Sequence, residues 1–123
     1  MYDNQLIKEV FTQILGACER IIKKTCNIND PEYFYSSEEN MDKLDAICIL
    51  LMAIGESLKK TDKITDGQLL VKYPQVDWKG LKGLRDIIGH QYFDINAEAI
   101  LQTCKNDIPA LKDVVLKIIE VTI

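Results

Sequence analysis

The chain has 123 residues and a mass of 14.1 kDa, which suffices for one domain but not for two ordinary ones. Its 47% hydrophobic and 28% charged residues exclude intrinsic disorder and collagen-like repetition. The net charge of −4 disfavours broad, non-specific binding to nucleic acid, although it permits a small local site for one phosphate.

Neither a membrane segment nor a disulfide framework is expected. The longest apolar run, Ala46 to Ile54, is far shorter than the roughly 20 residues of a membrane span, and the chain opens with polar residues. Cys18, Cys26, Cys48 and Cys104 form no C-x-x-C pair, and three of them stand among aliphatic residues. We therefore expect free thiols, a cytoplasmic location, and neither a metal nor another cofactor.

The first third of the chain predicts one helix and a loop. Apolar residues between Leu6 and Ile22 recur at helical spacing, and Asp3 or Asn4 is placed to cap the start of this helix. Residues 27–37 are predicted to form a loop with three aromatic side chains that cover the end of the core, namely Tyr33, Phe34 and Tyr35.

A second helix is predicted from Ser36 or Ser37 to about Lys60, because two glutamates follow the serines in the first turn. Its centre, from Ala46 to Ile54, is apolar on every side. This centre must therefore be enclosed by several neighbouring helices or by a second subunit.

The second half of the chain predicts three more helices and no strand. A short helix starts at Thr65-Asp66 and ends before Pro74, and another starts near Asp77. The last runs from Asn96 to Glu120 with a kink, because Pro109 removes a backbone donor. The expected fold is all-α: an up-and-down bundle of four to five helices in a single domain. That domain spans residues 1–123, with further loops at 61–65, 73–76 and 91–96.

Four residues near the end of the fourth predicted helix are candidates for chemistry. The only histidine, His90, follows Arg85, one of two arginines, by five residues. On a straight helix the two lie roughly 140° apart, so the arginine must reach around to meet the imidazole. Asp86 shares the face of His90 and is placed to accept a ring N–H, while Tyr92 aligns with Arg85 if the helix continues that far.

Each of these residues also fits an ordinary structural role. A lone histidine at a helix end is commonly a cap or a surface residue, and Arg85 with Asp86 equally fits a solvated ion pair. Tyr92 fits a ring at the edge of the core. Glu56 fits a charge at the end of the apolar centre of the second helix. The pattern alone leaves these alternatives open.

The run Arg85-Asp86-x3-His90-x-Tyr92 resembles the Arg-x4-His-x-Tyr signature of HEPN-domain proteins, specifically their HepT branch. The resemblance spans most of the chain, because three further segments agree in the expected order. One local departure, at the two residues that flank the histidine, puts only fine substrate preference in doubt. The agreeing segments are Ile54-Gly55-Glu56, Trp78 to Gly83, and Asn106-Asp107-Ile108-Pro109-x-Leu111.

This resemblance implies a HEPN-like fold and a metal-independent endoribonuclease that is the toxin of a type VII-like toxin–antitoxin pair. Arg85 and His90 are then catalytic, with Asp86 and Glu56 in supporting roles. The implied partner is a minimal nucleotidyltransferase antitoxin, which silences the enzyme by attaching AMP to Tyr92. Family members form symmetric homodimers in which the two motifs meet across a cleft, and this interface also offers a place for the apolar helix centre.

The residue chemistry is compatible with cleavage of RNA by its own 2′-hydroxyl. His90 suits proton transfer, a second His90 from the dimer mate supplies the complementary acid, and Arg85 clasps phosphate oxygens. A function of another class stays open as well: a non-catalytic helical interaction module that binds the nucleotidyltransferase. Acidic charge and a broad apolar seam are typical of both.

Overall fold

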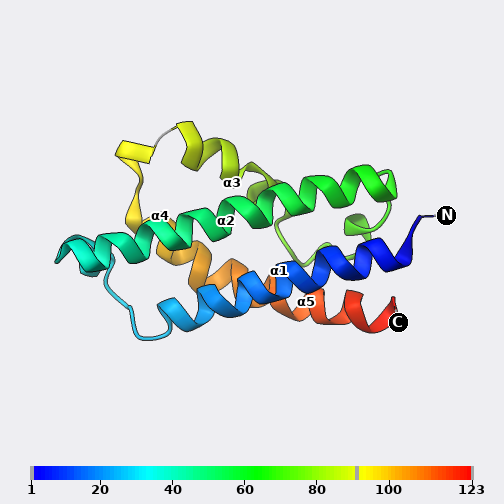
Figure 1. Cartoon of the computed structure of the whole chain (residues 1–123), viewed down its shortest axis with the longest axis horizontal. Coiled ribbons are helices and arrows are strands. Elements are labelled where there is room, and N and C mark those ends of the chain that lie inside the picture. Colours follow the sequence, from blue (N-terminus) through cyan, green and yellow to red (C-terminus); the bar gives the residue numbers. More distant parts are fainter. Residues whose placement is uncertain (1, 91, 123) are drawn as a thin grey trace.

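The structure is a computed structural model that describes residues 2–90 and 92–122, and over these residues the chain is helical with no strand (Figure 1). The predicted all-α bundle is therefore confirmed. The α-helices are α1 (Asn4–Thr25), α2 (Glu38–Thr65), α3 (Trp78–His90), α4 (Ala97–Gln102) and α5 (Ile108–Val121). The shorter segments are the 3₁₀ turns η1 (Pro31–Tyr35), η2 (Leu70–Lys72) and η3 (Tyr92–Asp94), and the π-helical turn η4 (Thr103–Asp107).

Side-chain caps fix the starts of the helices. The carboxylate of Asp3 accepts a hydrogen bond from the backbone N–H of Leu6 at 3.1 Å. The hydroxyl of Ser37 accepts one from Asn40 at 3.0 Å. Such bonds satisfy amide groups that have no partner inside the helix. The predicted starts of the first two helices are confirmed by these caps.

The end of α2 differs from the prediction. The helix does not stop near Lys60 but continues to Thr65, and the predicted short helix from Thr65-Asp66 is wrong. Asp66 instead ends α2 in the left-handed region at φ 52°, and Gly67 follows at φ 73°. Thr61 and Thr65 are buried. Each hydroxyl is satisfied within the helix, because it donates to a backbone carbonyl one turn earlier at 2.9 Å.

The last helix is interrupted where the proline predicts a kink. α4 ends at Gln102, the π-helical turn η4 covers Thr103–Asp107, and α5 begins at Ile108. Pro109 therefore falls in the first turn of α5, where its missing N–H has no partner to lose.

The core lies where four elements meet. α2 packs between α1 and α3, and α5 lies beside α1 (Figure 1). Phe34 of η1 is fully buried and covers the end of the core, whereas Tyr35 is 51% exposed. The prediction for the aromatic loop thus holds for Phe34 and fails for Tyr35. The largest fully buried aliphatic side chains of the helices include Ile7, Ile14, Ile21, Ile47, Leu51, Ile54, Leu58 and Ile108.

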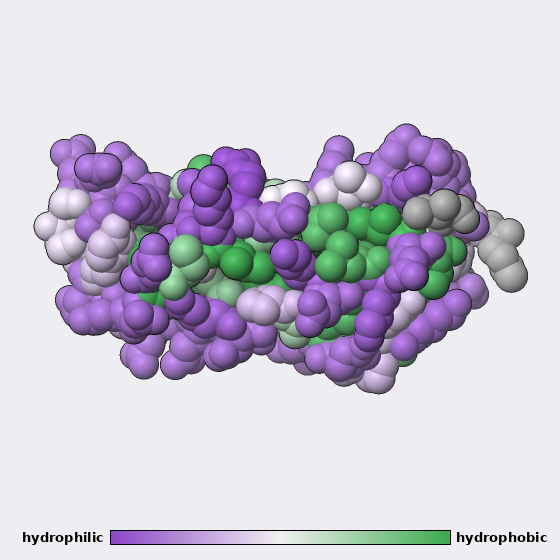
Figure 2. Space-filling view, turned by 90° about the horizontal axis from the view of Figure 1, so that it is seen from below, coloured by the Kyte–Doolittle hydropathy of each residue, from purple (hydrophilic) through white to green (hydrophobic). Residues whose placement is uncertain are grey.

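The apolar centre of α2 is only partly covered by its own chain. Ile47, Leu51 and Ile54 are buried, but Ile49 on the other side is 66% exposed. Figure 2 shows that the face on the α1 and α5 side is mostly polar, with an apolar stretch toward the end that holds both termini. Every helix of the described residues is too short or too polar to cross a bilayer.

The four cysteines are free thiols, and three of them belong to the core. Burial raises the pKa of Cys18 to about 12, that of Cys48 to about 11 and that of Cys104 to about 12. Cys26 is exposed. Because the thiolate is the reactive form, the three buried cysteines behave as small apolar side chains, as their sequence context predicts.

A thiol titration at pH 8 checks this arrangement. Native protein treated with Ellman's reagent should release about one equivalent of chromophore, from Cys26, because the buried thiols stay protonated and shielded. In concentrated guanidinium all four cysteines should react. Rapid reaction of two or more thiols in native protein contradicts the burial described here. So does rapid reaction of the remaining thiols in a natively folded Cys26→Ser variant.

Candidate ribonuclease site

The contact between α2 and α3 is made by backbone at Gly55. A Cβ placed on Gly55 would lie 2.8 Å from the carbonyl oxygen of Leu81 and 3.5 Å from that of Lys82. Real Cβ atoms do not approach an oxygen to 2.8 Å, so only glycine permits the two helices to lie this close. Gly55 therefore sets the position of α3, and with it the position of every side chain that α3 carries.

Two further contacts hold α3 in place. The indole Nε1 of Trp78 donates to the carbonyl of Tyr73 at 2.8 Å, which fixes the start of the helix. The ammonium of Lys82 pairs with the carboxylate of Asp62 on α2. The tryptophan-led run before Arg85 thus anchors α3 against α2.

Arg85 projects from α3 onto an exposed ion network. Its Nε lies 3.4 Å from Oε1 of Glu56, and the same oxygen lies 3.7 Å from Nζ of Lys59. Lys59 also lies 3.8 Å from the carboxylate of Asp86. The Arg85 side chain is 49% exposed and that of Glu56 is 52% exposed. Solvated pairs of this kind contribute only about 0–1 kcal/mol, so a stronger anion can displace Glu56 from Arg85.

His90 is the last residue of α3 and is exposed. Nη1 of Arg85 lies 4.0 Å from the place where a Cβ on Gly89, the residue before His90, would stand. Arg85 and His90 are therefore on one continuous helix, at its solvent-exposed C-terminal end, as their spacing predicts. The imidazole makes no hydrogen bond to another described residue.

The structure places the other candidates as follows. Asp86 contacts Lys59, and its proposed role in orienting His90 stays a prediction. Glu56 contacts the Arg85 side chain, and its supporting role stays a prediction. The side chain of Tyr92 lies outside the described residues. Lys59 was missed by the sequence reasoning, although its place three residues after Glu56 is a spacing typical of helix ion pairs.

The described side chains of the site form no metal-binding group. Across residues 2–90 and 92–122, no three His, Cys, Asp or Glu side chains come together as metal ligands. The chemistry that the site can support is that of its own groups: a guanidinium that binds an oxyanion and an imidazole that transfers a proton.

Comparisons with known proteins define the class to which this fold and site belong. The model of the family described as "Ribonuclease HepT-like" matches residues 7–118. The chain is 33% identical over 114 residues to "Putative RNase MJ1216" of Methanocaldococcus jannaschii, covering 93% of this chain and 88% of that protein. It is 35% identical over 67 residues to "Probable ribonuclease HepT" of Thermococcus cleftensis, covering 54% and 57%. No solved structure matches. The chain belongs to the HepT-like ribonuclease family, as its motif predicts.

The contact at Gly55 is tested by a matched pair of glycine substitutions. Gly55→Ala should lower the free energy of unfolding by about 1–3 kcal/mol, because its methyl group meets a backbone carbonyl that cannot move aside. Gly83→Ala in α3 meets nothing within 4 Å and should be neutral or stabilising by about 0.5–1 kcal/mol. Urea unfolding followed by circular dichroism measures both, and equal effects refute the close approach.

Proposed function

We propose that this protein is a metal-independent endoribonuclease toxin that cleaves RNA at Arg85 and His90. The observation that carries the proposal is the solvent-exposed placement of both residues at one end of α3, with the Arg85 guanidinium extended toward the C-terminal end of the helix. Membership of the HepT-like ribonuclease family supports RNA as the substrate. The absence of a metal-ligand cluster among the described residues is compatible with general acid–base chemistry.

The reaction follows from the chemistry of these two groups. The 2′-hydroxyl of a ribose loses its proton to an imidazole and attacks the adjacent phosphorus, and the P–O bond to the 5′-oxygen breaks. The leaving oxygen takes up a proton, so the products are a 2′,3′-cyclic phosphate and a 5′-hydroxyl. Arg85 exchanges Glu56 for the phosphate oxygens and stabilises the dianionic phosphorane.

A homodimer completes this scheme. Each chain has one histidine, but the reaction needs a base and an acid at the same phosphate. A two-fold pairing of the α2–α3 face brings a second His90 to the site. Support comes from Ile49 of α2 and Ile87 of α3, which are 66% and 55% exposed in the single chain and would be covered in a pair.

A nucleotidyltransferase antitoxin is the proposed regulator. It attaches AMP to Tyr92, two residues after His90, and the added phosphate competes with RNA for the Arg85 guanidinium. The backbone of Tyr92 begins η3, two residues beyond the last residue of α3. In this proposal, AMP attached there adds a negative charge close in the chain to His90.

Cleavage assays in EDTA test the catalytic assignment. His90→Ala should lower the cleavage rate by a factor on the order of 10²–10⁴, and Arg85→Ala by on the order of 10²–10³, with an unchanged helical circular dichroism spectrum. Lys79→Ala, an exposed change on the same helix, should cleave normally. An RNA with 2′-deoxyribose at the cleaved position should stay intact. Full activity in either variant removes the catalytic assignment and favours a non-catalytic interaction module.

Intact-mass analysis tests the modification of Tyr92. Co-expression with a minimal nucleotidyltransferase of the proposed antitoxin class should add one or more AMP units to the chain and abolish RNA cleavage. Tyr92→Phe should gain no mass and keep its activity in the presence of the antitoxin, because the acceptor hydroxyl is gone. A mass gain retained by Tyr92→Phe places the modification on another residue.

A further inference from the structure

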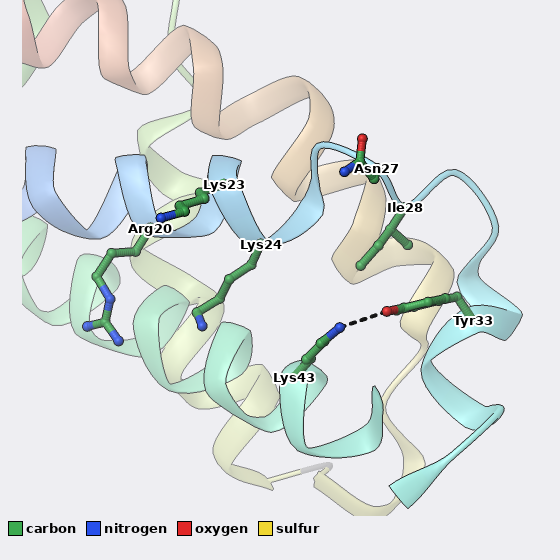
Figure 3. Close-up of a pocket in the computed structure, with 7 residues that line it drawn as sticks. All are labelled: Arg20, Lys23, Lys24, Asn27, Ile28, Tyr33 and Lys43. Atoms are coloured by element: carbon green, nitrogen blue, oxygen red, sulfur yellow. Dashed lines mark hydrogen bonds between the residues drawn. The ribbon is translucent and has the colours of Figure 1, made fainter. Parts of the chain in front are cut away.

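A hollow of about 560 Å³ lies between the C-terminal end of α1 and the start of α2, whereas Arg85 and His90 are on α3 (Figure 3). Four cationic side chains border it: Arg20, Lys23 and Lys24 from α1, and Lys43 from α2. Four of the chain's 15 basic residues thus gather around one hollow, in a protein whose net charge is −4. This local excess of positive charge runs against the average of the surface.

None of these four cations forms an ion pair within the described part of the chain, although Glu39, four residues before Lys43, interacts with that lysine electrostatically. Among the described residues, no carboxylate oxygen lies within 4.0 Å of their side-chain nitrogens, whereas Lys82 and Arg85 each contact one such oxygen and Lys59 contacts two. Like charges that share a hollow without counter-charges repel one another. An anion held between them removes this repulsion, so the hollow favours a negatively charged occupant.

Capping of helix α1 does not account for the lysines. The carbonyl oxygen of Thr25, the last residue of α1, accepts from Nζ of Lys105 at 2.6 Å and from the backbone N–H of Ile28 at 3.0 Å. The end of the helix is therefore satisfied by groups other than Lys23 and Lys24. Both amines are left available for a ligand.

Lys43 is held at the hollow by Tyr33. Its Nζ donates to the phenol oxygen of Tyr33 at 2.8 Å and lies 5.3 Å from the centre of the same ring (Figure 3). The hydrogen bond to Tyr33 raises the pKa of Lys43, so the amine is cationic at neutral pH. The same ring and the buried side chain of Ile28 form an apolar wall beside the cations. Cations next to an aromatic ring are the combination that binds single-stranded nucleic acid.

We propose that this hollow binds the phosphates of a nucleotide, and that the occupant is the single-stranded RNA held for cleavage at α3. The identity of the RNA rests on the proposed function, whereas the anion site rests on its own contacts. Arg20 and Lys24 stand one helical turn apart, roughly 6 Å along α1, and so present a row of charge rather than a point. Both side chains reach from α1 toward α2 in Figure 3. The C-terminal ends of α1 and α3 lie toward the same end of the molecule with α2 between the two helices, so a strand that contacts both has to pass over α2 (Figure 1).

The test compares two double variants of equal charge. Arg20→Gln/Lys24→Gln removes two cations from the hollow, and Lys63→Gln/Lys117→Gln removes two exposed cations elsewhere. Binding of a fluorescent 2′-O-methyl RNA strand, which cannot be cleaved, is measured by anisotropy at several salt concentrations. The first variant should bind on the order of tenfold more weakly. The negative slope of log association constant against log salt concentration should become shallower by about 1.4. The second should match the unaltered protein.

A second arm uses adenosine monophosphate as the probe. If the unaltered protein binds no RNA but binds the mononucleotide, and only the hollow variant loses it, the anion site stands and the ribonuclease function fails. Equal losses in both double variants mean that net charge alone governs binding and overturn the proposed site. Unchanged binding in the hollow variant, or no binding of either probe to the unaltered protein, overturns it as well.

Discussion

The direct backbone contact between α2 and α3 at Gly55 is the constraint on which the site depends. Helices that pack through side chains keep their axes about 8–10 Å apart, and a glycine at the crossing removes part of that spacing. α3 carries both Arg85 and His90, and α2 carries Glu56 one residue after the glycine. The distance from Arg85 to Glu56 is thus a consequence of how closely the two helices pack.

The two positive sites of the molecule differ in how their charge is held. Arg85 is neutralised by Glu56 in a solvated pair that an RNA phosphate can open. Among the described residues Arg20 and Lys24 form no ion pair, and Lys43 donates a hydrogen bond to the phenol oxygen of Tyr33. An arginine that is paired before substrate binds keeps its side chain in a defined orientation. Cations without an ion-pair partner attract a polyanion at long range. Under the proposed function, attraction and catalysis fall on separate surfaces of one small bundle.

The sequence predicts most of the fold because its signals are local. Asp3 and Ser37 mark helix starts, because each side chain accepts a hydrogen bond from the backbone amide three residues further on. The end of α2 was not predicted correctly, because no residue before Thr65 breaks a helix. The helix ends where the backbone of Asp66 adopts the left-handed conformation. The spacing of Arg85 and His90 can be read within one helix, but contacts between different helices cannot. Glu56 meets Arg85, and Lys43 faces α1, only once separate helices have packed together.

The π-helical turn between α4 and α5 fixes the register of the last helix. A turn of this kind holds one residue more than an α-helical turn, and here it covers Thr103–Asp107. Lys105, inside this turn, also binds the end of α1 through Thr25. Removal of that one extra residue would return the turn to α-helical geometry and leave Ile108, Leu111 and Val115 facing the core. A deletion within α5 itself would instead rotate the residues after it by roughly 100°, so η4 is the part of the last helix that best tolerates a shorter chain.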